Sequence, residues 1–391
     1  MKRFLLLHLS LLIGAAIWLP CLHLLFRADP RDYRAEGEPP QITRAIAARH
    51  IALWQDTDFK EHELAQMRAV NAEWDFMGRT YLVLSLANMA CREPDKEADY
   101  LDVVDRIIAD TLRLEEEKGL FHFLMSYARG APFVVQPPRS LFLDGEIALM
   151  MAARRLVKEN PDYKPLMDER IATMVARMEE SPVLAAESYP NECWIFCNTV
   201  AIAAIKLSDI LDGPRHPDFI ERWLDVTKRE MLDPETGLLY ASYDVAGVPL
   251  QGPEGSSIWM AAHCLQLVDE EFAQDQYQRA KKELARSVLG FGYAREWPPS
   301  YIGPADVDSG PVVAGISTAS SGLAFMGASA FGDTDYLQRL LTSLRFAGFP
   351  VETDGRLMFC ASNQVGDAVV LYAAVLGPLW EKARLLEEKG S

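Results

Sequence analysis

The sequence predicts an all-α protein, an (α/α)6 toroid of six helical hairpins around a central cavity, behind an N-terminal membrane anchor helix. Two observations predict this fold. From residue 42 onward apolar residues recur at helical spacing almost throughout, and no run of strands that could build a sheet interrupts them. Helices rich in small apolar residues also alternate with more highly charged ones, which is typical of inner and outer helices in a toroid.

The alternation is clearest in one pair of neighbours. Segment 193–211 is apolar on nearly every face, whereas segment 215–231 is amphipathic and highly charged. Turn residues such as Asn160-Pro161-Asp162 separate the helices. An irregular helical array or α-solenoid is the alternative architecture. The predicted helices are 42–57, 60–71, 75–91, 97–117, 139–158, 163–179, 193–211, 215–231, 256–270, 273–289, 313–330, 333–346 and 365–388.

The N-terminus has the features of a membrane anchor. Lys2 and Arg3 precede an apolar run from Phe4 to Phe26, which is long enough to cross a hydrocarbon core of about 30 Å. The basic residues favour a cytoplasmic N-terminus and an exported, periplasmic domain. No small-x-small cleavage site ends the run, so an uncleaved anchor is favoured over a signal peptide. The predicted organisation is therefore anchor 1–26, linker 27–40 and barrel domain 41–391.

The charge balance restricts the partners. Lysine and arginine total 39 against 56 acidic residues, a net charge of −17. Such a surface repels phosphate backbones, so nucleic acid is not expected as a partner. The expected partners are a small-molecule substrate and the membrane, through the N-terminal helix; a homo-oligomer is compatible with the sequence.

Cysteine usage argues against both a disulfide scaffold and a metal site. Five of the six cysteines lie beyond the anchor, and an odd number leaves at least one free thiol. Cys193 and Cys197 share a helix face, but no histidine stands near them at ligand spacing, so no metal is predicted. Both can be simple packing residues. Cys197 is distinguished by its neighbours Asn198, Trp194 and Tyr189.

Polar residues gather where the predicted inner helices begin, and these ends face one mouth of a toroid. The segments are 71–75, 144–146, 188–198, 255–257, 306–311 and 362–367. Asp, Ser and Asn are also ordinary N-caps, and this explains Asp75, Ser256 or Asp367 without any function. Glu146 differs because its surroundings are Leu, Phe, Ile, Ala and Met. Burial there would raise its pKa, as a general acid at neutral pH requires.

Several aromatic residues are candidates for substrate binding. Trp74 follows Glu73 at one helix start, and Tyr240 and Tyr243 stand on a short extended piece. A long loop between Gly290 and Gly315 carries Trp297 and Asp308, and ordered loops of that length often bind substrate.

Two segments carry a resemblance to a known family: Tyr189-Pro-Asn-Glu-Cys-Trp-Ile-Phe-Cys197-Asn198-Thr-Val-Ala and Leu232-Asp-Pro-Glu-Thr-Gly-Leu-Leu-Tyr240-Ala-Ser-Tyr243. Both resemble the corresponding parts of bacterial linalool dehydratase/isomerase. The similarity extends weakly from about residue 70 to the C-terminus. It implies an (α/α)6 barrel in the periplasm that uses no metal and no organic cofactor. It also implies acid–base removal or addition of water at an allylic alcohol.

The resemblance carries over to some residues only. Cys197 matches one of the family's two active-site cysteines, and Tyr240 or Tyr243 matches a pocket tyrosine. Ser188 stands where the family has its other cysteine, and Gly145-Glu146 stands where it has Gly-His. These two differences alter the acid–base groups available at the site.

The leading hypothesis is a cofactor-free lyase or isomerase acting on a hydroxylated, partly apolar substrate. Its predicted catalytic residues are Glu146, Cys197 and Asp75. A glycoside hydrolase or other carbohydrate enzyme is the first alternative, because the fold is common there and carboxylates beside tryptophans suit sugars. The second alternative is an envelope protein that binds a glycan or lipid without turnover. The predicted substrate-binding residues are Ser188, Tyr189, Trp194, Tyr240, Tyr243, Asp308 and Trp74.

Overall fold

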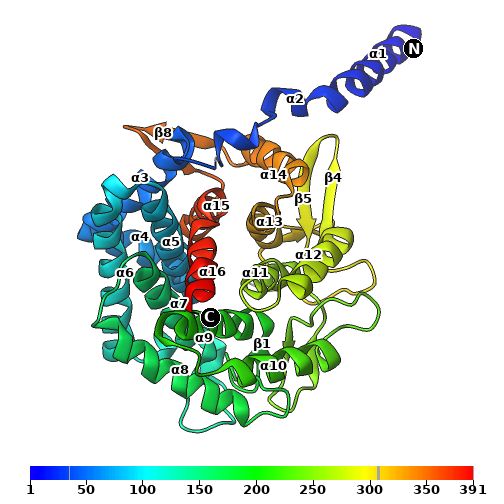
Figure 1. Ribbon diagram of the computed structural model, residues 1–391. Coiled ribbons are helices and arrows are strands. Elements are labelled where there is room, and N and C mark those ends of the chain that lie inside the picture. The colour runs from blue at the N-terminus through cyan, green and yellow to red at the C-terminus, as the bar shows by residue number, and fades with distance from the viewer. Residues whose placement is uncertain (35, 306–308, 391) are drawn as a thin grey trace.

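The computed structural model describes residues 1–34, 36–305 and 309–390. Within them six helices form a closed inner ring, in which each helix contacts the next and the last contacts the first (Figure 1). The predicted toroid is confirmed. The inner helices are α5 (Ala72–Arg92), α7 (Leu141–Val157), α9 (Ile195–Asp212), α11 (Gly255–Leu265), α13 (Thr318–Ala330) and α15 (Gln364–Val375).

Outer helices cover this ring. Every residue of α7 is buried, as expected for an inner helix. The outer α10, by contrast, buries one stripe formed by Phe219, Ile220, Trp223 and Thr227. An additional helix, α4 (Thr57–Val70), packs against α5. The outer helices are α3 (Gln41–Gln55), α6 (Glu97–Lys118), α8 (Tyr163–Glu179), α10 (Pro217–Glu230), α12 (Glu270–Leu284) and α14 (Thr334–Ala347).

The C-terminal helix α16 (Pro378–Gly390) closes one end of the ring. The sequence predicted one helix over 365–388, but Gly377 adopts φ 128° and Pro378 follows, so the chain turns there. Helix α16 contacts α5, α7 and α9 near their C-terminal ends. The Leu379 amide donates to Asn88 Oδ1 at 3.1 Å, and Lys382 Nζ donates to the Val157 carbonyl at 3.0 Å. The inner helices begin at the other end of the ring.

Short strands connect the hairpins. The extended piece predicted at 237–243 contributes β2 (Ser242–Tyr243), which pairs with β1 (Cys193–Trp194) and β3 (Pro249–Gln251). The expectation that no strands would build a sheet was wrong, because four short strands form a sheet of order β4-β5-β7-β6. This sheet takes the place of the end of the predicted helix 273–289 and of the start of the predicted helix 313–330. Its strands are β4 (Ala285–Val288), β5 (Phe291–Arg295), β6 (Val312–Val313) and β7 (Ile316–Ser317), and a separate hairpin joins β8 (Pro350–Thr353) to β9 (Arg356–Phe359).

The N-terminal segment leaves the domain as a separate helix. Helix α1 (Lys2–Trp18), continued by a short turn and α2 (His23–Phe26), points away from the ring (Figure 1). No residue of α1 is buried, and the helix is long and apolar enough for a membrane anchor or a signal sequence. The following segment packs on the barrel: Ala28, Pro30 and Tyr33 are buried. The predicted linker therefore holds helices α1 and α2 close to the domain.

Candidate active site

Glu146 lies inside the ring, on the second turn of α7. Its side chain is buried, and Thr80 of α5 donates a hydrogen bond from Oγ1 to Glu146 Oε2 at 2.5 Å. Burial raises the pKa of Glu146 to about 8, although the Thr80 bond acts in the opposite direction. The carboxyl group is therefore mostly protonated at neutral pH.

Other neutral donors surround Glu146. Burial, with Glu146 nearby, raises the pKa of Tyr81 and of Cys264 well above their usual values. The Tyr81 hydroxyl is buried without a hydrogen-bond partner among the described residues. Next to this group His263 Nε2 and the Tyr372 hydroxyl are 2.7 Å apart, and burial lowers the pKa of His263 to about 4. A protonated carboxyl, a thiol, phenols and a neutral imidazole thus meet in the interior.

Four residues near Glu146 were not predicted from the sequence: Tyr81, Cys264, His263 and Tyr372. Each lies within an inner helix, where an aromatic residue or a cysteine has the pattern of ordinary core. Only the three-dimensional convergence of α5, α7, α11 and α15 distinguishes them.

Cys197 lies on the mouth side of Glu146. A Cβ on Gly145 would stand 3.3 Å from the Ala201 amide nitrogen, so α7 and α9 approach closely at this level. Cys197 is one turn before Ala201, roughly 6 Å nearer the mouth. Tyr243 is fully buried; burial and the adjacent thiols of Cys193 and Cys197 raise its pKa. Cys197 and Tyr243 therefore lie together.

Tyr189 belongs to a group at the mouth. Its hydroxyl donates to Glu73 Oε1 and accepts from the Met125 amide at 2.9 Å, while its ring stacks on Tyr127 with centroids 4.7 Å apart. Burial and the Glu73 carboxylate raise the pKa of Tyr189. Glu73 was not among the predicted site residues, yet it is the nearly buried carboxylate at the start of α5 that faces the phenols.

Ser188 and Trp194 flank this group. The Ser188 hydroxyl is buried and has no hydrogen-bond partner among the described side chains and backbone. The Trp194 indole donates to Glu192 Oε2 at 3.1 Å, and the same oxygen accepts from the Tyr127 hydroxyl at 3.1 Å. Both predicted binding residues thus lie beside Tyr189.

Asp75 is held in a different environment. Arg79 Nε donates to Asp75 Oδ1 at 2.9 Å, and Arg68 binds Oδ2 at 2.8 Å. Arg79 also binds Asp110 on the outer helix α6 at 2.8 Å. Both carboxylate oxygens are engaged by guanidinium groups that connect α5 with α4 and α6. This arrangement suits structural support better than proton transfer, and Asp75 is separate from the group around Glu146.

The remaining predicted binding residues are more scattered. Trp74 is half-buried against the hydrophobic core, and Tyr240 is half-buried with its amide bonded to the Met231 carbonyl at 3.0 Å. Asp308 lies outside the described residues.

A second carboxylate group begins α11. Glu296 accepts from the Ser256 amide at 3.0 Å and from the Ser256 hydroxyl at 2.6 Å. The Trp297 indole donates to Glu254 Oε1 at 3.4 Å. The sequence analysis placed Trp297 in a long binding loop but did not select either glutamate.

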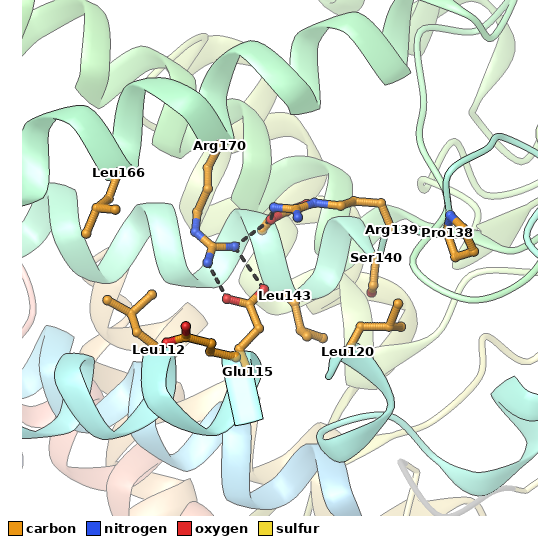
Figure 2. Close-up of a pocket in the computed structure, with 11 residues that line it drawn as sticks. Leu112, Glu115, Leu120, Pro138, Arg139, Ser140, Leu143, Leu166 and Arg170 are labelled. Carbon is orange, nitrogen blue, oxygen red and sulfur yellow. Dashed lines mark hydrogen bonds and ion pairs between the residues drawn. The ribbon is translucent and has the colours of Figure 1, made fainter. Parts of the chain in front are cut away.

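A cavity of about 580 Å³ opens outside the ring, between α6, α8 and the start of α7 (Figure 2). Arg170 crosses it to bind Glu115 and, at 2.6 Å, Asp144; Arg139 binds Asp144 from the other side. Three acidic residues and two arginines line this cavity, and it does not include Glu146 or Cys197. Among the described residues no cluster of His, Cys, Asp and Glu side chains could hold a metal ion.

A closed helical ring with a buried acid in its interior and carboxylates at one mouth places the chain among the (α/α)6 barrels. The family model of linalool dehydratase/isomerase matches residues 157–365, more than half of the chain, and the protein belongs to that family.

Solved structures are similar to this chain at low sequence identity. The GH76 alpha-mannanase BT2949 of Bacteroides thetaiotaomicron matches with a TM-score of 0.50 and 13% identity, over 80% of this chain and 87% of that chain. The unsaturated glucuronyl hydrolase of Bacillus sp. GL1 matches with a TM-score of 0.49 and 12% identity, over 75% of this chain and 84% of that one.

Proposed function

We propose that the protein is an acid–base lyase or isomerase that acts on a hydroxylated, partly apolar small molecule on the exported side of a membrane. One observation carries the proposal: the Glu146 carboxyl group is buried inside the ring beside Thr80, where burial raises its pKa to about 8, and Tyr81 and Cys264 lie near it. Family membership supports the reaction class.

The proposed reaction needs only side chains. Glu146 accepts from Thr80 through Oε2, so Oε1 is assigned to the substrate. The carboxyl group gives its proton to an allylic hydroxyl, the C–O bond breaks, and water leaves with both bonding electrons. The resulting allylic cation loses a proton from an adjacent carbon to the Glu146 carboxylate, which regenerates the acid. If water instead adds to the other end of the allylic cation, the added water gives its extra proton to the Glu146 carboxylate and the product is the isomeric alcohol.

The apolar surroundings favour this chemistry. A carboxylate in a buried site stabilises an adjacent cation more strongly than it would in water. Cys197 and Tyr243, nearer the mouth, are assigned to hold the departing water or the hydroxyl group. Burial and the neighbouring thiols raise the pKa of Tyr243, so its hydroxyl stays protonated and can donate a hydrogen bond.

The carbohydrate alternative has one observation in its favour, the pairing of Glu254 with Trp297 at the mouth. Sugar-binding tryptophans normally expose a face to the ligand. Here Trp297 is 8% exposed, and Trp74 and Trp194 are half-buried. We therefore prefer the lyase or isomerase assignment. A purely binding protein has no need of a buried carboxyl group, whose ionised form burial destabilises.

The test measures turnover of a panel of allylic alcohols and a panel of oligosaccharides by three full-length proteins. These are the wild type, the variant Glu146→Gln and the control variant Glu352→Gln. Glu352 is exposed on β8, so its variant makes the same chemical change away from the ring. Alcohol turnover that is lost in Glu146→Gln and kept in Glu352→Gln supports the proposal. Sugar release by the wild type, or alcohol turnover that survives in Glu146→Gln, contradicts it.

A further inference from the structure

The segment that leaves the anchor is packed onto one small part of the barrel wall. Phe26 of α2 meets Phe346 edge to face with ring centroids 5.0 Å apart, and Phe346 lies 5.1 Å from Phe291. His23 lies over the turn between β4 and β5, where a Cβ on Gly290 would stand 2.3 Å from the imidazole. Figure 1 shows α1 leaving the molecule on the side of α14 and this hairpin.

Exposed apolar side chains gather around that contact. They occupy the tip of the β4–β5 hairpin, the end of α14 and the neighbouring β8–β9 hairpin. Val351 and Met358 are directly opposite each other in that second hairpin, so both point to one face. We call this set the apolar rim: Val288, Leu289, Phe346, Phe349, Val351 and Met358, all exposed.

Two members of the apolar rim have an unfavourable backbone conformation. Leu289 and Phe349 adopt φ values of 48°, in the left-handed region that bulky side chains rarely adopt. Phe349 is also 65% exposed, so burial within the barrel does not offset this cost. Local strain of this kind is typical of functional positions.

The charge around the apolar rim is opposite to that of the chain as a whole. Segments 284–294 and 336–351 contain Arg286, Arg339 and Arg345 and no aspartate or glutamate, in a chain of net charge −17. Arg339 donates to Ser287 Oγ at 2.8 Å, and Arg345 donates to the Arg27 carbonyl at 3.1 Å. These arginines therefore surround the point where the anchor meets the domain. In the second hairpin, Glu352 on β8 and Asp354 in the turn are acidic, and Arg356 on β9 is basic.

We propose that the apolar rim rests on an anionic lipid bilayer, so that the barrel lies with this part of its wall against the membrane. The proposal depends on the anchor and goes beyond it, since a tether alone leaves the domain free to turn. Exposed Leu, Val and Phe side chains enter the boundary between headgroups and acyl chains, and the arginines bind the headgroups. The barrel then has one fixed orientation relative to the membrane, and the membrane is the phase in which a partly apolar substrate accumulates.

The experiment is labelling of the full-length chain by a lipid with a photoreactive acyl chain, in vesicles with and without phosphatidylglycerol. Labelled peptides are identified by mass spectrometry. We expect labels in 1–26 and also in the segments 286–291 and 345–351, the latter increased by phosphatidylglycerol. Ile302 and Val313 serve as internal controls. They are 84% and 70% exposed and follow the end of β5 that is opposite the Gly290 turn, so they should stay unlabelled.

A double variant, Leu289→Asn with Phe349→Asn, separates docking from tethering. Asparagine tolerates the left-handed region, so the variant should fold at least as well as the wild type. Labelling of the apolar rim should fall severalfold while labelling of 1–26 stays constant. Labels confined to 1–26 in the wild type would overturn the proposal. So would rim-to-rim cross-links between two chains, which would assign this face to a second copy of the protein. Absence of label in 1–26 would refute the anchor instead.

Discussion

Thr80 on α5 donates a 2.5 Å hydrogen bond to Glu146 Oε2 on α7, and this bond joins two neighbouring inner helices inside the ring. A hydroxyl donor favours the ionised carboxylate, whereas burial favours the protonated acid. Burial dominates, and the pKa of Glu146 is raised to about 8. The pair therefore sets how readily the acid gives and regains its proton.

Turnover should depend on the protonated form of Glu146. The rate should be constant at lower pH and fall about tenfold per pH unit above a pKa of about 8. The variant Thr80→Val lacks the donor that lowers the pKa of Glu146. The alkaline limb, which is the part of the pH–rate curve where the rate falls, should therefore move to higher pH. The measurement is kcat against pH for both proteins. An alkaline limb at the same pH in the variant would show that Thr80 does not act on the reacting carboxyl.

The same group should make stability depend on pH. The pKa of Glu146 is higher in the folded chain than its usual 4.5, so the folded state holds its proton to higher pH. The free energy of unfolding should then decrease as pH rises from about 4.5 to about 8, by roughly 1.4 kcal/mol per pH unit from this group.

Urea unfolding at several pH values tests this slope. The pKa of Asp367 is raised to about 7 by burial and acts in the same direction, so the difference between wild type and Glu146→Gln isolates Glu146. A difference that does not vary with pH would mean that Glu146 is ionised in the folded chain.

Asp75→Asn should affect stability more than catalysis. The substitution leaves the buried Arg79 with one carboxylate partner, Asp110, and removes the partner of Arg68. Breaking a buried ion pair costs about 3 kcal/mol. The measurements are urea unfolding and kcat of the folded fraction. A loss of kcat at unchanged stability would restore Asp75 to the catalytic group predicted from the sequence.

Gly145→Val should push α7 away from α9. A Cβ at this position already stands 3.3 Å from the Ala201 nitrogen, so the added methyl groups have no room, and overpacking costs about 1–3 kcal/mol. Gly322→Ala is the matched control, because it lies in helix α13 with nothing within 4 Å. It should stabilise the chain by about 0.5–1 kcal/mol through helix propensity. Similar thermal shifts in both variants would contradict the close approach of α7 and α9.

The ring could be predicted because its helices differ in composition. An inner helix such as α7 must be apolar on every face, whereas α10 needs one apolar stripe, and both patterns are visible in a single sequence. Strand β4 was missed for the opposite reason: it is short and its apolar residues continue the pattern of α12, so nothing local marks Leu284 as the end of the helix. Strand β5 lies in the segment that was predicted as a long loop between Gly290 and Gly315.

The site was predictable only in part. Glu146 could be selected because a carboxylate in an apolar run is unusual. Asp75 looked equally suitable, but the sequence does not show that Arg68 and Arg79 point toward it. Tyr81 and Cys264 reach Glu146 from helices far apart in the chain, and that convergence is a property of the ring closure alone.

Trp380→Ala should destabilise the chain and disturb the interior group as well. The Trp380 indole on α16 stacks on His263 with ring centroids 5.1 Å apart and donates to the His263 carbonyl at 3.4 Å. His263 in turn binds the Tyr372 hydroxyl, which lies near Tyr81. Loss of a buried tryptophan costs about 3–5 kcal/mol.

Leu385→Ala is the control on the same helix, since Leu385 is 54% exposed and a change there should stay within about 0.5 kcal/mol. Urea unfolding and the pH profile of kcat should be measured for both variants. We expect the Trp380 variant to lose stability and to shift the alkaline limb, because water admitted past α16 would lower the pKa of Glu146. A destabilised variant with an unchanged limb would show instead that α16 closes the ring without isolating the acid from solvent.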